Sequence, residues 1–180
     1  MKPALAAFIP VAELFGRLLL QEIDAQLLRE LRHDEVSKAL ADVGLFLPDL
    51  PTAELLDELA AEYCSCFLGP ADPVPLIQSV WEGGSYESGP AAAIRQIATQ
   101  TGIEFDREAA RSAPADHLGC ILLLWAELVE SCSEHAGYLV QHHFAWARRP
   151  LQLVARRGGF YGQLCAAVDD LLEHIKALSV

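Results

Sequence analysis

Apolar residues recur at intervals of three and four positions over most of the chain, which is the spacing of one buried helix face. The segments with this spacing carry, in order, Val11, Leu14, Phe15 and Leu18; Leu56, Leu59, Tyr63 and Phe67; Ile94, Ile97 and Ala98; Leu118, Ile121, Leu122, Trp125, Leu128, Val129 and Cys132; and Phe160, Tyr161, Leu164, Cys165, Val168, Leu171, Leu172 and Ile175. No stretch alternates apolar and polar residues over six positions, as a strand would. The pattern therefore predicts an all-α fold, a single-domain helical bundle over residues 1–180.

Residues with a strong preference for helix ends mark the predicted boundaries. We expect Thr52 to cap one helix, and Gly69-Pro70 to end it. Pro90 can open the next helix, and Gly102 can end it in a left-handed conformation. The longest apolar helix follows Asp116, which we expect to cap it. Because the middle of that helix is apolar on all sides, we expect it at the centre of the bundle.

Residues 69–90 interrupt the helical pattern between the N-terminal and C-terminal helices. This stretch is rich in proline and glycine, and we interpret it as a loop. It also carries Trp81 and Tyr86, which we expect to be exposed. Long loops inside a compact domain are uncommon and are often functional.

Charge excludes some classes of partner. The 180 residues hold 25 acidic and 13 basic side chains, a formal net charge of −12. Nucleic acids and anionic membrane surfaces both require a dense cationic face, so we expect neither as a partner. The charge is also uneven, since residues 1–62 hold 12 acids against 5 bases, and residues 135–168 hold no acid. Four arginines of that acid-free segment are interpreted as a solvated face or as partners of the acidic helices, with an anion site as the alternative: Arg148, Arg149, Arg156 and Arg157.

Positive mean hydropathy requires a test for membrane spans. The longest uninterrupted apolar run, residues 118–126, has nine residues, whereas a spanning helix needs roughly 20. The N-terminal residues loosely resemble a leader, but prolines interrupt the apolar stretch and the helical spacing continues through it. We therefore expect no stable membrane insertion and a cytoplasmic location.

Cofactor and metal signals are weak. The five cysteines form no Cys-x-x-Cys pair, and we interpret them as free buried thiols in a reducing compartment. His142 and His143 are adjacent and diverge by about 100° on a helix, so we expect no metal site. The phosphate-binding and dinucleotide-binding glycine motifs are absent from the sequence, and we expect no cofactor.

Asp116 and His117 stand in the densest polar group of the sequence. One interpretation is structural: a helix start followed by a histidine that bonds to a nearby loop. The other is functional, because an aspartate beside a histidine can orient the imidazole for base chemistry. The second interpretation gives an alternative function, a small helical hydrolase or nucleotide-dependent factor. Trp146 is likewise open between a core role and a binding role.

An ordered set of motifs resembles a known family. The set is Glu62-Tyr63-x-x-x-Phe67-x-Gly69-Pro70, Pro75 with Ser79-Val80-Trp81, Pro114-x-Asp116-His117, His143-Phe144-x-Trp146 with Pro150, and Phe160-Tyr161. In order and spacing it is similar to the TorD/DmsD/NarJ family of cytoplasmic chaperones for molybdenum oxidoreductases. The resemblance covers residues from about 52 to the C-terminus, and the N-terminal helices more loosely.

The resemblance implies a non-catalytic, all-helical protein. Such proteins bind the twin-arginine signal peptide of a molybdopterin oxidoreductase, and some bind the body of the apo-enzyme. They delay export until the cofactor is inserted, and they occur as monomers or domain-swapped dimers. Carried over residue by residue, the peptide-binding positions implied here are Tyr63, Phe67, Trp81, Pro114, Asp116, His117 and Trp146. The sequence departs from the family at Ala113, where an acidic residue is common.

A binding hypothesis follows from this resemblance. A groove lined by tryptophan and phenylalanine would take the apolar part of the leader. Asp116 and the acidic helices would take the guanidinium groups, since bidentate bonds favour arginine over lysine. The loop 69–90 would move to admit the peptide.

Overall fold

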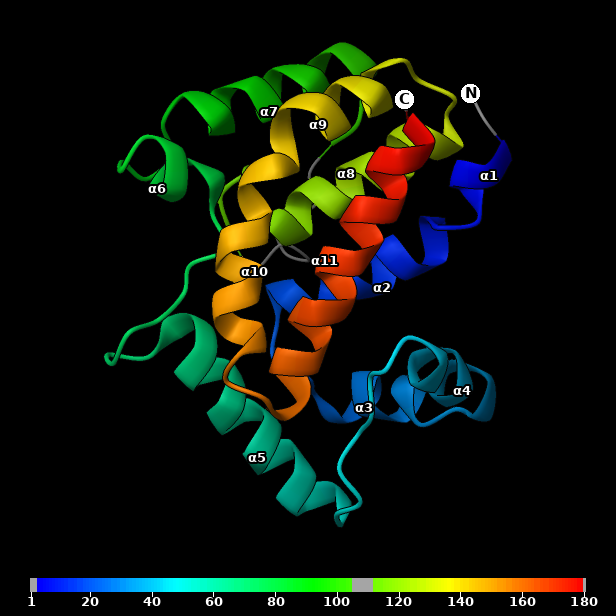
Figure 1. Ribbon diagram of the computed structural model, residues 1–180, viewed down its shortest axis with the longest axis vertical. Helices are drawn as coiled ribbons and strands as arrows, with labels where there is room; N and C mark the ends of the chain where they lie inside the picture. The colour runs from blue at the N-terminus through cyan, green and yellow to red at the C-terminus, as the bar shows by residue number, and fades with distance from the viewer. Residues whose placement is uncertain (1–2, 105–111, 180) are drawn as a thin grey trace. The chain divides into compact units, whose positions relative to one another are not determined.

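The computed structural model describes residues 3–104 and 112–179. Its α-helices are α1 (Pro3–Ala6), α2 (Ile9–Leu20), α3 (Ala25–Leu31), α4 (Asp34–Asp42), α5 (Thr52–Tyr63), α6 (Gln78–Glu82), α7 (Gly89–Thr101), α8 (Leu118–Glu130), α9 (His135–His143), α10 (Arg148–Ala155) and α11 (Gly159–Ser179) (Figure 1). A π-helical turn, η1 (Cys64–Leu68), follows α5, and a 3₁₀ turn, η2 (Ala145–Ala147), follows α9. Within the described residues there is no strand, so the all-α prediction is confirmed.

The helices divide into two compact units. Unit 1 contains Met1–Gln21, Leu76–Arg149 and Asp170–Val180, and unit 2 contains Glu22–Pro75 and Pro150–Asp169. Unit 1 thus holds α1, α2 and α6 to α9, and unit 2 holds α3 to α5. Helices α10 and α11 contribute residues to both units. The predicted single domain over residues 1–180 stays a prediction.

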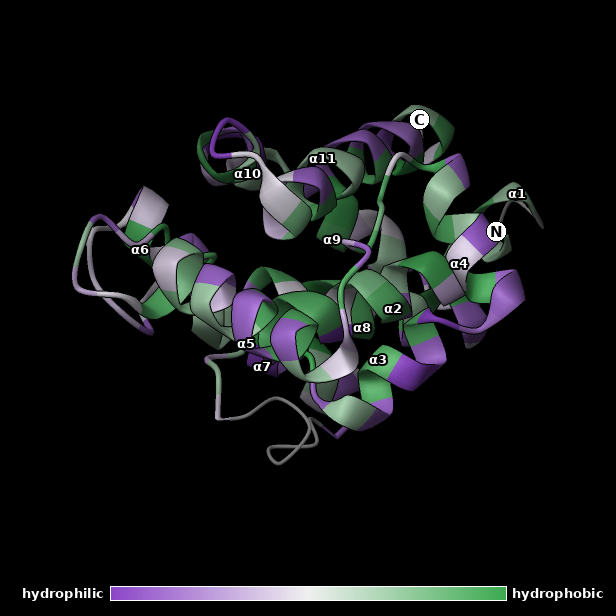
Figure 2. Ribbon diagram, turned by 90° about the horizontal axis from the view of Figure 1, so that it is seen from below, coloured by the Kyte–Doolittle hydropathy of each residue, from purple (hydrophilic) through white to green (hydrophobic). Residues whose placement is uncertain are grey.

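Helices α2 and α8 pack against each other at the centre of unit 1. Figure 2 shows α8 as a largely hydrophobic helix beside α2, and ten of its residues are buried. The two backbones approach closely at Gly16 and Gly119. A Cβ on Gly119 would lie 2.5 Å from Cγ of Leu20 and 2.7 Å from the carbonyl oxygen of Gly16. The glycine at this crossing therefore sets how closely α8, and the motif that precedes it, packs on α2.

In unit 2, Glu62 of α5 caps the start of α11. Its carboxylate accepts hydrogen bonds from the backbone N–H groups of Phe160 (3.1 Å) and Tyr161 (2.7 Å). These are donors that a helix N-terminus leaves without an intrahelical partner, and a negative charge there also complements the helix dipole. Gly159 has φ +71°, and a Cβ on it would lie 2.5 Å from Glu62 Oε1. The Glu62-Tyr63 and Phe160-Tyr161 motifs are thus parts of one contact.

Tyr63 and Phe67 form an aromatic cluster with Tyr161 in unit 2. The ring centroid of Tyr63 lies 5.1 Å from that of Phe67 and 5.3 Å from that of Tyr161, and the centroids of Phe67 and Tyr161 lie 5.7 Å apart. All three contacts are edge-to-face. Such geometry adds about 0.5–1.5 kcal/mol per pair beyond the area buried. Burial raises the pKa of the Tyr161 hydroxyl well above its usual range.

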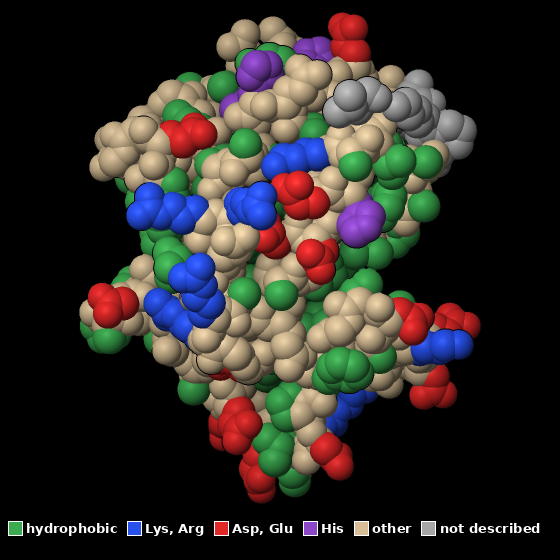
Figure 3. Space-filling view, in the orientation of Figure 1, with side chains coloured by type: hydrophobic (Ala, Val, Ile, Leu, Met, Phe, Trp, Pro, Cys, Tyr) green, Lys and Arg blue, Asp and Glu red, His purple; other side chains and the backbone are tan. Residues whose placement is uncertain are grey.

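Charged side chains lie over several of the helices. Figure 3 shows acidic side chains over α4 and α5, with a basic side chain among those over α4, and basic side chains over α10. The interpretation of the arginines as a face for acidic helices is too simple for Arg157. Its guanidinium donates to the carbonyl oxygens of Ser65 and Asp72, so it holds the segment that follows α5.

Three predictions about local structure were wrong. The segment 69–90 is not a continuous loop, because it contains α6. Thr52 is the first residue of α5 rather than its N-cap, and its hydroxyl accepts a hydrogen bond from Arg32. The cysteines are all free, but two of them, Cys64 and Cys132, are exposed rather than buried. None of the described helices has the length and apolar character needed to cross a membrane.

Candidate functional site

The motif Pro114-x-Asp116-His117 forms a turn directly before α8. The His117 N–H donates to the carbonyl oxygen of Pro114 at 2.9 Å, which closes the turn. An antiparallel bridge then joins His117 to Ile77, just before α6. Two backbone hydrogen bonds complete it, from Leu118 N–H to Leu76 O and from Gln78 N–H to Asp116 O. The backbone of the motif therefore positions α6.

Asp116 acts on α6 rather than on α8. Its Oδ2 accepts a 2.7 Å hydrogen bond from the backbone N–H of Ser79, in the first turn of α6. The side chain is completely buried, and Oδ1 has no hydrogen-bond partner. The expectation that Asp116 caps the long apolar helix is wrong, because its carboxylate accepts from Ser79, which lies 37 residues earlier in the chain, in α6.

His117 caps α8. Its Nδ1 accepts a 3.1 Å hydrogen bond from the Gly119 N–H. Burial lowers the pKa of the imidazole to about 4, so the ring is neutral near pH 7. With Nδ1 acting as acceptor, the proton of the neutral ring lies on Nε2. Asp116 bonds to Ser79 and His117 to Gly119, so the two side chains do not form an acid–base dyad.

Gln78 connects α6 to the end of α9. Its Oε1 accepts from Nδ1 of His143 at 2.8 Å, and its Nε2 donates to the carbonyl oxygen of His142 at 3.3 Å. The same Nε2 donates to Oε2 of Glu82 at 2.8 Å. Gln78 is 2% exposed. Because both the oxygen and the nitrogen of this buried amide are hydrogen-bonded, the amide has one orientation. It therefore fixes the position of α6 against the end of α9 and orients the Glu82 carboxylate.

Four buried polar side chains therefore meet around α6: Gln78, Ser79, Asp116 and His143. Three of their atoms have no hydrogen-bond partner, namely Ser79 Oγ, Asp116 Oδ1 and His143 Nε2. Burial is the main cause that lowers the pKa of His143, and the Asp116 charge acts in the opposite direction. We call this group the α6 anchor. Burying a polar atom without a hydrogen-bond partner costs free energy, so a group of such atoms marks this region as a candidate for function.

The tryptophans of the predicted site have different environments. Trp146 is buried in η2, and its indole N–H donates to the carbonyl oxygen of His143 at 2.8 Å. Trp81 of α6 is half-buried, and the guanidinium carbon of Arg149 lies 5.4 Å from its ring centroid. Trp81 therefore has an accessible aromatic surface, whereas Trp146 supports the backbone of the anchor from inside.

The seven predicted positions fall into two groups. Unit 1 contains Trp81, Pro114, Asp116, His117 and Trp146, and the anchor brings them to one region. Tyr63 and Phe67 belong to the aromatic cluster of unit 2. Asp116 is the position whose environment differs most from the binding hypothesis, because its carboxylate is buried.

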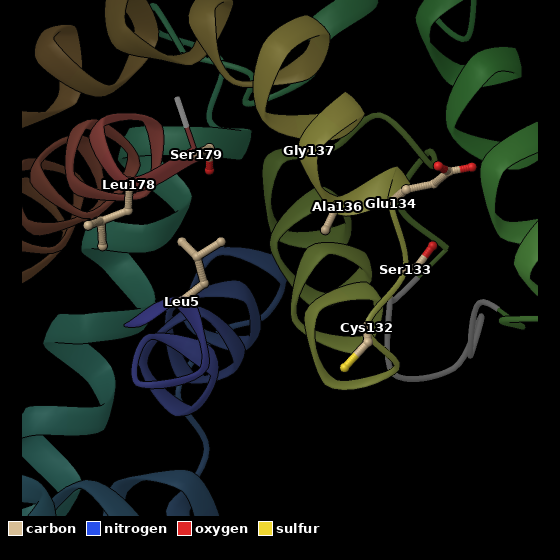
Figure 4. A pocket seen from close by; sticks show the side chains of 8 residues that line it. All are labelled: Leu5, Cys132, Ser133, Glu134, Ala136, Gly137, Leu178 and Ser179. Atoms are coloured by element: carbon tan, nitrogen blue, oxygen red, sulfur yellow. The ribbon is translucent and has the colours of Figure 1, made fainter. Parts of the chain in front are cut away.

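A separate pocket of about 320 Å³ lies elsewhere in unit 1. Leu5 of α1, the turn before α9 and Leu178 near the end of α11 line it (Figure 4). None of the predicted binding residues is among its lining residues. Within the described part of the chain, no group of three or more His, Cys, Asp or Glu residues could hold a metal ion.

Comparison with known proteins decides the family. The sequence model described as nitrate reductase delta subunit matches residues 20–152. The chain belongs to the nitrate reductase delta subunit family. A crystal structure of an Archaeoglobus fulgidus protein assigned to redox enzyme maturation has a similar fold. It is 20% identical with a TM-score of 0.65, over 92% of this chain and 93% of that one. No curated protein matches the sequence.

Membership of this family confirms the resemblance drawn from the motifs. Members of the family are maturation chaperones of redox enzymes rather than catalysts, so this chain is a maturation chaperone and not an enzyme. The hydrolase alternative built on Asp116 and His117 is therefore wrong, whereas the nucleotide-dependent alternative stays a prediction. The hydrogen bonds give the physical reason, since each side chain of that pair is bonded to a backbone N–H instead of to the other.

Two residues of α6 that the family motifs did not include lie on either side of Ser79-Val80-Trp81. Gln78 belongs to the anchor through its hydrogen bond with His143, and its amide also donates to the carboxylate of Glu82. The sequence offered one signal for the role of Gln78. Together with Ser79 it lies between the apolar residues Ile77 and Val80, in a stretch interpreted as a loop. A polar residue in such a position is worth testing as a buried hydrogen-bonding group.

Proposed function

We propose that this chaperone binds the twin-arginine signal peptide, the apo-form, or both, of a molybdopterin oxidoreductase in the cytoplasm. Binding assists cofactor insertion and delays export of the client until insertion is complete. Family membership supports the client class. The acidic chain is suited to a basic leader, because its net charge of −12 attracts cationic segments over a distance limited by salt.

One observation carries the peptide-binding proposal. The motif residues hold α6 in place from inside, and α6 carries the accessible face of Trp81. A surface of this kind suits a leader peptide with a basic region followed by an apolar segment, because the indole ring offers both apolar area and a cation-binding face.

His117 and Pro114 have supporting roles in this proposal. The neutral imidazole has Nε2–H available as a donor for a peptide carbonyl, and its charge state does not change near neutral pH. Pro114 begins the turn that positions His117. Asp116 keeps its place among the important residues, but as a positioning residue for α6.

The aromatic cluster of unit 2 is the second proposed contact. Tyr63 is buried, Phe67 is half-buried and the neighbouring Leu68 is 65% exposed. An exposed leucine beside an accessible ring offers an apolar contact for the mature part of the client. We propose this role for Tyr63 and Phe67 separately from the leader site on unit 1.

Client maturation in cells tests this function. A client molybdopterin oxidoreductase is produced with and without this chain, and molybdenum content and exported enzyme are measured. We expect less molybdenum per enzyme without the chaperone, and premature export of apo-enzyme. Equal molybdenum content and equal export in both strains would contradict the proposal. Light scattering of the purified chain distinguishes a monomer from a domain-swapped dimer, both of which the resemblance allows.

A further inference from the structure

A guanidinium group already lies on the accessible face of α6. The Arg149 guanidinium carbon is 5.4 Å from the centroid of the Trp81 ring, within the range of a cation–π contact. Arg149 is exposed and Trp81 is half-buried. Contacts of this kind at exposed sites contribute about 0.5–1 kcal/mol. The ring therefore accepts a guanidinium, and the contact is weak enough to be exchanged for another one.

Glu82 follows Trp81 in α6, so the two side chains diverge by about 100° around the helix and offer two separate contacts. Glu82 is exposed, and Oε2 accepts a 2.8 Å hydrogen bond from the buried Gln78 amide. That amide is fixed by His143 and by the His142 carbonyl. A carboxylate has about four lone-pair sites, so one bond from Gln78 leaves capacity for the two parallel N–H donors of an arginine. A carboxylate held in one orientation loses less entropy on binding than a free one.

Asp116 does not have this accessibility. Its side chain is completely buried, and Oδ2 is occupied by the Ser79 N–H. A guanidinium could reach it only if α6 left its position. The exposed acid that the anchor orients is Glu82.

We infer that Trp81 and Glu82 each provide a contact for one guanidinium of an arginine pair, and that Arg149 occupies the Trp81 face in the free protein and is displaced by an arginine of the bound peptide. The identity of that peptide as a client leader rests on the proposed function. When one guanidinium replaces another on the Trp81 ring, the net charge beside the ring does not change. A lysine side chain has no planar group to stack on the ring in place of Arg149, and it forms no bidentate bond with Glu82.

A short probe tests the inference without a client. Acetyl-Arg-Arg-amide and acetyl-Lys-Lys-amide are titrated into the full chain, and tryptophan fluorescence is followed. Of the three tryptophans, Trp125 and Trp146 are buried, so the response reports mainly on Trp81. Trp81→Phe identifies that signal by removing it. Circular dichroism verifies that each variant is folded.

Two variants test the inference, and each has a matched control. Arg149→Ala removes the competing guanidinium, and we expect about two- to fivefold tighter binding of the arginine probe, the equivalent of one exposed cation–π contact. Arg148→Ala removes the same charge from the neighbouring position and should not tighten binding in this way. Glu82→Gln should abolish the preference for the arginine probe over the lysine probe. Its matched control is Glu87→Gln, which removes an exposed acid that lies 3.8 Å from Arg95.

The outcomes separate this inference from the proposed function. Unchanged or weaker arginine-probe binding by Arg149→Ala overturns it, as does a preference for arginine that survives Glu82→Gln. If the arginine probe behaves as expected but a full client leader does not bind, the inference stands and the leader proposal fails. If the leader binds but neither variant changes its affinity or its arginine preference, the leader proposal stands and the inference fails. If neither probe nor leader binds, both fail.

Discussion

The carboxylate of Asp116 and the backbone N–H of Ser79 are joined by a completely buried 2.7 Å hydrogen bond. This bond connects the turn before α8 to the first turn of α6, and Gln78 and His143 connect α6 to α9. The Pro-x-Asp-His motif of this chaperone therefore positions α6 through buried hydrogen bonds within unit 1. Its most polar residue determines where an adjacent short helix lies, and that helix carries the accessible Trp81.

Variants at Asp116 distinguish a positioning role from direct contact with the peptide. Asp116→Ala leaves the buried Ser79 N–H without an acceptor, which should lower the free energy of unfolding by about 1–3 kcal/mol and weaken leader binding. Asp116→Asn keeps an oxygen that can accept this bond. We therefore expect its leader affinity to remain close to that of the wild type. Denaturant unfolding and calorimetric titration measure the two effects. An asparagine variant that binds as weakly as the alanine variant would show that the charge itself is required.

The helix crossing at Gly119 predicts a steric effect. Gly119→Ala places a methyl group 2.5 Å from Leu20 and 2.7 Å from the Gly16 carbonyl oxygen. Overpacking of this kind typically costs about 1–3 kcal/mol, and it should lower the urea midpoint. Gly137→Ala in α9 is the matched control, since its Cβ meets no atom within 4 Å. The control should be neutral or stabilising by up to about 1 kcal/mol. Equal effects of the two substitutions would contradict close packing at the crossing.

The cap that Glu62 provides for α11 predicts a graded loss of stability. Glu62→Ala removes the acceptor of both the Phe160 and Tyr161 N–H groups, and it should cost about 1–2 kcal/mol. Glu62→Gln retains an oxygen but not the charge, and should cost less. Glu58→Ala removes an exposed acid one turn earlier in the same helix and should change stability by no more than about 0.5 kcal/mol. Thermal unfolding compares the three. The assignment fails if the Glu62 and Glu58 alanine variants are equally stable.

His117 predicts a loss of stability in mild acid. Burial lowers the pKa of its folded-state imidazole from 6.5 to about 4. Between these two values the unfolded chain binds a proton that the folded chain does not, so stability falls as the pH decreases from 6.5 to about 4. One proton corresponds to a slope of at most about 1.4 kcal/mol per pH unit. His117→Asn keeps a capping oxygen and should reduce this slope, which unfolding at several pH values measures. His143, whose pKa is also lowered, remains in both proteins. Parallel pH profiles of the two proteins would exclude His117 as the cause.

The sequence predicted the long helices because their signals are local. Periodic apolar residues defined α2, α5, α8 and α11, and glycine determined one end directly. Gly102 ends α7 with φ +72°, a conformation that glycine adopts without strain. The family motifs identified most residues around the anchor, because the order and spacing of motifs can be recognised in the sequence without knowing which residues are in contact.

The remaining features depend on contacts between distant residues. Helix α6 has five residues, too few for a periodic pattern, and it is held by Asp116 from 37 positions away. Asp116 was expected to cap the helix beside it because aspartate is a preferred capping residue. His117 took that place, so the aspartate was free to cap another helix. The burial of Asp116 likewise could not be predicted from residue type.

Calorimetric titration of the full chain with its client leader measures directly whether the chaperone recognises the arginine pair. The leader with its arginine pair is compared with the same leader carrying two lysines, at physiological salt and at raised salt. We expect measurable binding of the arginine leader, with a preference over the lysine leader that persists as salt screens the general attraction of an acidic protein for a basic peptide. Equal affinities for the two leaders at raised salt, or no binding of either, would contradict this expectation.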